Sequence, residues 1–155
     1  MTAGMAIRVT TYVHATCIAL RAGRNWRGIL LRGPSGAGKS DLALRLIEAG
    51  GRLVADDQTA LVPQGRGLVA TPPGTLAGLL EVRGVGIVKL GRSQLLVRAT
   101  ITLLVDLVPP DRIERLPERS RETLLGVDLP VVALAPFEAS APAKLRLALA
   151  RATAA

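Results

Sequence analysis

The architecture of this chain follows from eight consecutive residues, Gly33-Pro34-Ser35-Gly36-Ala37-Gly38-Lys39-Ser40. They match the pattern Gly-x-x-x-x-Gly-Lys-Ser/Thr of a phosphate-binding loop. In such a loop the glycines let backbone N–H groups turn toward phosphate oxygens. The lysine carries its charge to the β- and γ-phosphates, and the serine hydroxyl can ligate Mg²⁺. Residues 33–40 are therefore predicted to bind the phosphates of ATP together with Mg²⁺.

The segments on either side of this loop have the patterns of a strand and a helix. Residues 28–32 form a short apolar run that leads directly into the loop. After it, Leu42 and Leu46 stand at helical spacing, and the pair Gly50-Gly51 is a helix stop signal. Residues 52–55 then read as a second apolar strand. A strand, helix and strand within about thirty residues predict a βαβ unit and an α/β fold.

The rest of the chain continues this alternation without a repeat or a linker. Further strands are predicted at residues 7–13, 16–21, 59–63, 100–107 and 131–134. The Gly- and Pro-rich segment 63–90 is interpreted as short strands and functional loops, and the charged segment 109–126 as an exposed connection. Ser140 can cap a final helix with Pro142 in its first turn. Residues 1–155 are predicted to form one domain, as their length suggests.

Two adjacent acids, Asp56 and Asp57, end the predicted strand at residues 52–55. Carboxylates at the end of a strand that follows a phosphate-binding loop can lie beside the metal and the γ-phosphate. One of the pair could hold the metal or its water, and the other could accept a proton from an attacking hydroxyl. The alternative interpretation is an exposed pair of acids at a turn.

Composition narrows the class of protein further. The chain is 49% hydrophobic with one Phe, one Trp and one Tyr, so its core is predicted to be aliphatic. The net charge of +8 suits a polyanionic partner. Nevertheless, the lack of aromatic stacking platforms and of a dense basic stripe argues against nucleic acid. ATP therefore remains the expected anion.

The same composition bears on location. The single cysteine, Cys17, cannot form an internal disulfide and is expected to be a buried apolar residue in a reduced compartment. No run approaches the roughly 18 apolar residues of a membrane span. Residues 1–11 have no signal-peptide pattern. We expect a cytoplasmic protein without a membrane partner.

Four segments in this order resemble the HPr kinase/phosphorylase family. They are the phosphate-binding loop, Asp41-Leu42-Ala43-Leu44, Leu53-Val54-Ala55-Asp56-Asp57 and Leu80-Glu81-Val82-Arg83-Gly84-Val85-Gly86-Ile87. The resemblance spans roughly residues 7–150 and corresponds to the catalytic domain alone, without the N-terminal domain of longer members. It implies a phosphoenolpyruvate-carboxykinase-like P-loop core, built of a mixed β-sheet with flanking helices.

The resemblance also implies roles for individual residues. Lys39 and the loop amides would bind ATP, while Ser40 and Glu81 would hold Mg²⁺ with Asp56 nearby. Asp57 would be the catalytic base. The only histidine, His14, matches a family histidine upstream of the loop and would be catalytic as well. Further catalytic and substrate-contacting positions are implied at Arg115, with Arg112 as a competitor, and at Arg83, Gly84 and Gly86.

Residues 80–89 have a physical logic of their own. Glu81 and Arg83 lie two residues apart, so on an extended strand both face one side. Gly84 and Gly86 would allow a close approach of the backbone. The alternative interpretation, without the resemblance, is a simple strand and turn.

The function implied is a Mg·ATP-dependent protein-serine kinase that phosphorylates the phosphocarrier protein HPr. A homo-oligomer, commonly a hexamer, is implied as well. The resemblance also implies a reverse reaction, in which phosphate dephosphorylates HPr. The sequence departs from the family here, because the family's Arg-containing C-terminal segment corresponds to residues 134–140, which contain no arginine. The alternatives are a kinase of small molecules and a protein that senses ATP without turning it over.

Overall fold

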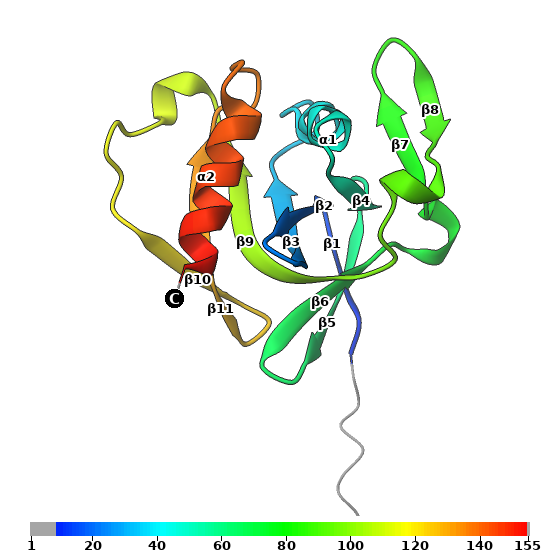
Figure 1. Ribbon diagram of the computed structural model, residues 1–155, viewed down its shortest axis with the longest axis horizontal. Helices are drawn as coiled ribbons and strands as arrows, with labels where there is room; N and C mark the ends of the chain where they lie inside the picture. Colours follow the sequence, from blue (N-terminus) through cyan, green and yellow to red (C-terminus); the bar gives the residue numbers. More distant parts are fainter. Residues whose placement is uncertain (1–8, 155) are drawn as a thin grey trace, which may run out of the picture.

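The computed structural model describes residues 9–154, and Figure 1 shows a curled sheet with helices against it. The helices are α1 (Lys39–Glu48) and α2 (Ala141–Thr153), with 3-10 turns η1 (Gly74–Leu76), η2 (Arg92–Gln94) and η3 (Pro110–Arg112). The strands are β1 (Thr11–Val13), β2 (Ala15–Ala22), β3 (Asn25–Arg32), β4 (Arg52–Ala55), β5 (Thr59–Gln64), β6 (Gly67–Thr71), β7 (Leu79–Val82), β8 (Gly86–Lys89), β9 (Ala99–Leu107), β10 (Ser120–Leu124) and β11 (Val127–Leu134).

The main sheet has the order β1-β5-β6-β9-β3-β2-β4, and it forks at β9. The first residues of β9, Ala99 and Thr100, pair with β6 in antiparallel fashion. Its later residues, Leu104 to Leu107, pair with β11 in parallel fashion. β10 then extends the sheet beyond β11. The strong bend of β9 in Figure 1 lets one strand serve two different neighbours.

The predicted βαβ unit is formed by β3, α1 and β4. Both strands pair antiparallel with β2, so they run parallel to each other with β2 between them. The sequence predicts β2 as a strand at residues 16–21, but it does not reveal that this strand lies between the other two. α1 ends where predicted, since Gly50 has φ 99° and the N–H of Gly51 donates to the carbonyl of Leu46 at 2.8 Å.

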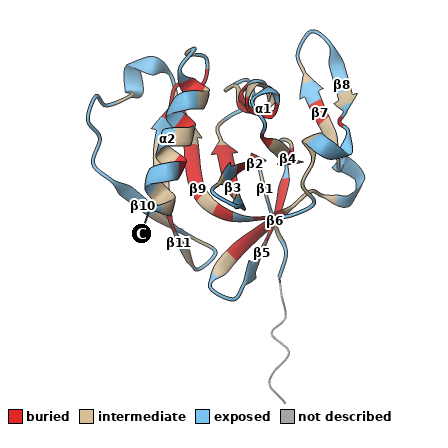
Figure 2. Cartoon of the chain, viewed as in Figure 1, coloured by how far each residue is buried: buried red, intermediate tan, exposed pale blue. Residues whose placement is uncertain are grey.

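The core is aliphatic, as predicted, and it lies in two layers (Figure 2). One layer packs α1 and α2 against the sheet through residues such as Leu31, Leu46 and Leu145. The other fills the concave side, between the central strands and β5–β6, with residues such as Leu30 and Leu61. Cys17 is fully buried there, and burial raises the pKa of its thiol to about 12.

Several predicted boundaries are corrected. β3 begins at Asn25 instead of residue 28, and the connection at 109–126 contains β10. A two-residue turn at Leu125 and Gly126, with φ 50° and 82°, joins β10 to β11, which begins at Val127 rather than 131. Of the strand expected at 7–13, residues 7 and 8 lie outside the described part of the chain.

The final helix begins as predicted, after Ser140. The Ser140 side chain makes no capping bond, and Leu145 and Leu149 are buried. Neither α1, with 10 residues, nor α2, with 13, is long enough to cross a membrane, and these are the only α-helices of residues 9–154.

Candidate functional site

The predicted phosphate-binding loop lies between β3 and α1, at the carboxyl end of β3. The Lys39 ammonium donates to the carbonyl oxygens of Gly33 at 2.7 Å and of Pro34 at 3.1 Å, which folds it back over the loop. Only 5% of Lys39 is exposed. Gly38 occupies the N-cap position of α1 and has no side chain to cap the first turn, so the N–H groups there remain for an anion.

Gly38 could not be another residue without a change in the loop. Its φ of 101° lies in the region that side-chain-bearing residues rarely adopt. A Cβ at this position would also lie 2.9 Å from Cζ of Phe137, whose ring covers the loop. The sequence identifies this glycine, but it gives no sign of the aromatic ring above it.

Asp56 joins three segments that are distant in the sequence. Its Oδ1 accepts hydrogen bonds from the hydroxyls of Ser40 at 2.7 Å and Thr16 at 3.1 Å. Its Oδ2 accepts one from the backbone N–H of Glu81 at 3.0 Å. The loop, β2 and the β7 strand are therefore tied to one carboxylate at the end of β4.

The side chain of Asp57, the next residue, pairs with His14. A hydrogen bond of 2.7 Å joins His14 Nε2 and Asp57 Oδ1, and because a carboxylate only accepts, Nε2 carries the proton. The Asp57 backbone has φ 63°, a strained conformation that aspartate tolerates better than most residues. Its N–H donates to the Thr16 hydroxyl at 3.0 Å, which helps to hold this geometry.

Thr16 was not predicted as a site residue, although it contacts both acids. It is fully buried, and its hydroxyl donates to Asp56 and accepts from Asp57. The only signal in the sequence is a hydroxyl-bearing residue within the otherwise apolar run at 16–21. That signal is weak, because threonine is also an ordinary strand former.

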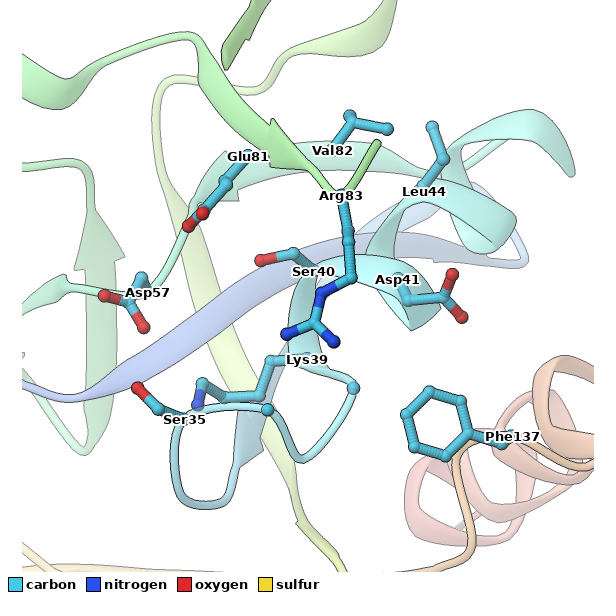
Figure 3. A pocket seen from close by; sticks show the side chains of 12 residues that line it. Ser35, Lys39, Ser40, Asp41, Leu44, Asp57, Glu81, Val82, Arg83 and Phe137 are labelled. Atoms are coloured by element: carbon cyan, nitrogen blue, oxygen red, sulfur yellow. The ribbon is translucent and has the colours of Figure 1, made fainter. Parts of the chain in front are cut away.

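The β7–β8 hairpin forms the opposite wall of the site. It is a separate two-stranded sheet, and it carries Glu81 in β7 and Arg83 in the turn that follows. Both side chains line the cleft, and Figure 3 shows Glu81 on the side of Asp57 and the Arg83 guanidinium above Lys39.

Gly84 lies in the turn of this hairpin, and Gly86 is the first residue of β8. A Cβ at either position would meet open space, so neither glycine allows a close approach within the chain. Their φ values of 86° and 124° explain the residue type instead.

The cleft between these walls has a volume of about 310 Å³, within the range of small-ligand sites. Its two ends differ in chemistry. One end carries charged and hydroxyl groups, from Ser35, Lys39, Ser40, Asp57 and Glu81. The other end is mostly apolar and is lined by Asp41, Leu44, Val82 and Phe137.

Arg115 and Arg112 do not join this cleft, contrary to the expected placement of Arg115. Arg112 ends η3, and Arg115 follows it in the connection to β10. In Figure 1 that yellow segment runs on the far side of α2 from α1, and neither arginine lines the cleft. The sequence match that suggested Arg115 was loose, and the arginine that does line the cleft is Arg83.

A second charged cluster lies at the end of β3, directly before the loop, and the sequence did not predict it. Arg32, the last residue of β3, donates to Asp106 of β9 at 2.8 Å and to Glu122 of β10 at 2.6 Å. Arg32 lowers the pKa of Glu122, and the two carboxylates raise the pKa of Arg32. Arg32 and Asp106 are register partners on parallel strands, a pairing that no local pattern reveals.

Comparisons with known proteins agree with this geometry. Residues 6–146 match the family model of the HPr serine kinase C-terminal domain. The HPr kinase/phosphorylase of Limosilactobacillus reuteri (strain DSM 20016) is 36% identical over 116 residues, which are 69% of this chain and 36% of that protein. That of Bordetella pertussis (strain Tohama I) is 35% identical over 140 residues, 84% of this chain and 44% of that protein. The chain thus spans less than half the length of these relatives.

A solved structure gives the same answer for the fold. The structure of the Hpr(Ser) kinase/phosphatase from Coxiella burnetii matches with a TM-score of 0.76 at 26% identity, covering 91% of this chain and 94% of that chain. This confirms the predicted α/β P-loop core with a mixed sheet and flanking helices. Because the family model covers most of its length, the chain belongs to the HPr serine kinase C-terminal domain family.

Proposed function

We propose that this chain transfers the γ-phosphoryl group of Mg·ATP to a seryl hydroxyl of the phosphocarrier protein HPr. The observation that carries the proposal is the 2.7 Å pair of His14 and Asp57, in which Asp57 lines the same cleft as Lys39 and Ser40. A carboxylate beside a phosphate-binding loop can accept the proton of an attacking hydroxyl. The relatives in several bacteria that carry the name HPr kinase/phosphorylase supply the substrate class.

The proton transfer is assigned to Asp57. His14 holds Oδ1, and no side chain of residues 9–154 donates to Oδ2, so this second oxygen can receive the seryl proton. The seryl oxygen then forms a bond to the γ-phosphorus while the bond to the departing ADP oxygen breaks. His14 acts as a positioning residue, because it fixes the carboxylate without contacting the reacting atoms.

Charge on the transferring group is balanced by the loop and the hairpin. Lys39 and the first-turn N–H groups of α1 face the β- and γ-phosphates in this assignment. Arg83 is assigned the role that the sequence predicted for Arg115, because its side chain lines the same cleft as Lys39 (Figure 3). Such positioning and electrostatic stabilisation account for most of the catalysis in phosphoryl transfer.

The residues present fit Mg²⁺. No group of three or more His, Cys, Asp or Glu side chains suited to a metal ion occurs within the described residues. Mg²⁺ at a nucleotide site needs fewer, because phosphate oxygens and waters fill most of its coordination. Ser40 and Asp56, 2.7 Å apart, and Glu81 would supply the protein oxygens. Bound there, Mg²⁺ would neutralise phosphate charge during transfer.

We propose the kinase direction as the main activity. Residues 134–140, where longer members carry an arginine-containing segment, have no arginine, and their one aromatic side chain is Phe137. A phosphate-using reverse reaction therefore has no cationic group in that segment. Action as one catalytic domain over residues 1–155, assembly into a homo-oligomer and a cytoplasmic location remain predictions.

The test is transfer of labelled γ-phosphate from ATP with Mg²⁺ to purified HPr, analysed for phosphoserine. Asp57→Asn should abolish transfer by at least about a hundredfold while ATP affinity is kept, because only the proton acceptor is lost. Asp111→Asn, at an exposed acid of η3, is the matched control and should transfer normally. Label on a metabolite instead of HPr would indicate a small-molecule kinase. ATP binding without any transfer would indicate a nucleotide sensor.

A further inference from the structure

The chain's only phenylalanine lies on the surface. Phe137 is 69% exposed, whereas the core is aliphatic. A single exposed apolar side chain is ordinary. This one differs because it lines the cleft beside the phosphate-binding loop, together with the partly buried side chains of Leu44 and Val82 (Figure 3).

The ring is held in this position by an arginine of α1. The Arg45 guanidinium donates to the carbonyl oxygens of Pro136 and Glu138, the residues on either side of Phe137. Arg45 is itself fixed by Asp41, one turn earlier, at 3.0 Å. The 134–140 segment is thus fastened to α1, and the ring is fixed across Gly38 rather than free to move with an exposed loop.

The position of Phe137 relative to the phosphate-binding residues indicates which part of a nucleotide it would contact. Lys39 and Ser40 define where the phosphates lie, and Asp57 and Glu81 lie on one side of them. Leu44, Val82 and Phe137 lie on the other side (Figure 3). A nucleotide whose γ-phosphate faces Asp57 therefore extends its nucleoside toward the apolar end.

We propose that the apolar end of the cleft is a binding site for the purine base, in which the base stacks on Phe137 and contacts Leu44 and Val82. This inference rests on the proposed function, because it requires a nucleotide on the loop. Aromatic rings bind bases through their faces, and such stacking tolerates any base. The one carboxylate at this end, Asp41, is engaged by Arg45, so the site offers little to distinguish adenine from guanine.

The experiment compares ATP with inorganic tripolyphosphate, which carries the phosphates without a base. Titration calorimetry of Phe137→Ala should show a loss of ATP affinity of about tenfold, as expected for one stacking contact, and an unchanged affinity for tripolyphosphate. Phe137→Trp should retain ATP affinity, and Phe137→Leu, which keeps apolar bulk without a ring, should resemble Phe137→Ala. Leu116→Ala is the matched control at an exposed apolar residue outside the cleft.

The outcomes separate this inference from the proposed function. If Phe137→Ala binds ATP as the unmodified protein does and HPr is still phosphorylated, the base site is wrong and the kinase assignment stands. Equal losses for ATP and tripolyphosphate would show that the ring supports the loop and not the base, which also overturns it. A raised KM for HPr with an unchanged KM for ATP would make Phe137 a protein-docking residue. Failure of the unmodified protein to bind either ligand would overturn both proposals.

Discussion

The two walls of the cleft are built in different ways. The wall formed by β3, the loop and α1 is built on the central sheet. Its residues are buried in both core layers, Leu31 and Leu46 in one and Leu30 in the other. The wall formed by β7 and β8 is a two-stranded sheet of mostly exposed residues, and it pairs with no strand of the nine-stranded sheet within residues 9–154 (Figures 1 and 2). The wall of β3, the loop and α1, called the rigid wall below, is part of the core, whereas the hairpin wall only packs against it.

The contacts of the hairpin wall are few and specific. Leu80 is fully buried in the core layer beneath α1, and the N–H of Glu81 donates to Asp56. Val82 and Val88 of the hairpin are only partly buried against the same layer, which leaves Leu80 as its one fully buried anchor. Glu81 and Arg83 therefore owe their positions to a few contacts. Small elements with little buried surface are the ones that open first in a native protein. The difference implies that phosphate binding is preorganised, whereas the hairpin groups depend on local stability.

The largest effect is expected from Leu80→Ala, which removes the anchor. Truncation of a fully buried leucine costs about 2–5 kcal/mol at most sites. Because the hairpin can detach without the central sheet, we expect faster amide hydrogen exchange at residues 79–89 with little change in α1. Leu46→Ala, at an equally buried residue of the rigid wall, is the matched control. It should accelerate exchange throughout the sheet, and equal patterns in the two variants would contradict the distinction.

Next in size is the effect of Arg83→Ala on the proposed phosphoryl transfer. The Arg83 side chain lines the same cleft as Lys39, so its loss should lower kcat by about a hundredfold, the magnitude found for one preorganised donor to developing charge. Folding should be unaffected, because Arg83 is exposed. Steady-state kinetics of Arg115→Ala provide the comparison, and that variant should keep its kcat. Normal kcat in Arg83→Ala together with loss of activity in Arg115→Ala would show that Arg115 is the catalytic arginine, as the sequence predicts.

The smallest effect concerns the rigid wall and its pH dependence. Arg32 lowers the pKa of Glu122 below its ordinary value of 4.5, so the folded state favours the ionised carboxylate. This stabilisation is present above about pH 4.5 and is lost as the pH falls through the lowered pKa. Glu122→Gln should therefore lower the free energy of unfolding by about 1 kcal/mol at pH 7, the upper range for a half-exposed pair.

Urea unfolding at pH 7 and pH 3 would measure this change in the free energy of unfolding. The difference between Glu122→Gln and the unmodified protein should shrink at the lower pH. Glu118→Gln, in the exposed connection before β10, serves as the control and should match the unmodified protein at both values. A difference that grows toward pH 3 would contradict the assigned direction of the pKa.

The contrast between the walls also explains what the sequence could predict. The phosphate-binding loop, α1 and the Asp56–Asp57 pair are specified by neighbouring residues, and local patterns predict them. Arg32 with Asp106 and Glu122 depends on the register of three strands, and Thr16 depends on which strand lies beside β4. Neither can be derived from spacing along the chain.

Long-range packing also explains why the sequence did not predict the positions of Arg115 and Phe137. Arg115 was favoured because it resembles a family arginine, but the β10–β11 hairpin directs its segment to the other side of α2. The sequence of residues 134–140 gives no sign that Phe137 lies at the cleft. Its position beside Gly38 depends on hydrogen bonds from Arg45, which is distant from it in the sequence. Long-range packing decides both positions.

The left-handed backbone at Asp57 has an evolutionary consequence. With φ at 63°, the position accepts Asp, Asn or Gly most readily, and most other residues would strain the turn. Each of the two permitted replacements is one nucleotide away from an aspartate codon, and each removes the proton acceptor while the turn survives. A single base change can therefore convert this enzyme, as proposed, into a folded protein that still holds a nucleotide but transfers nothing. The fold thus keeps open a short route from kinase to sensor.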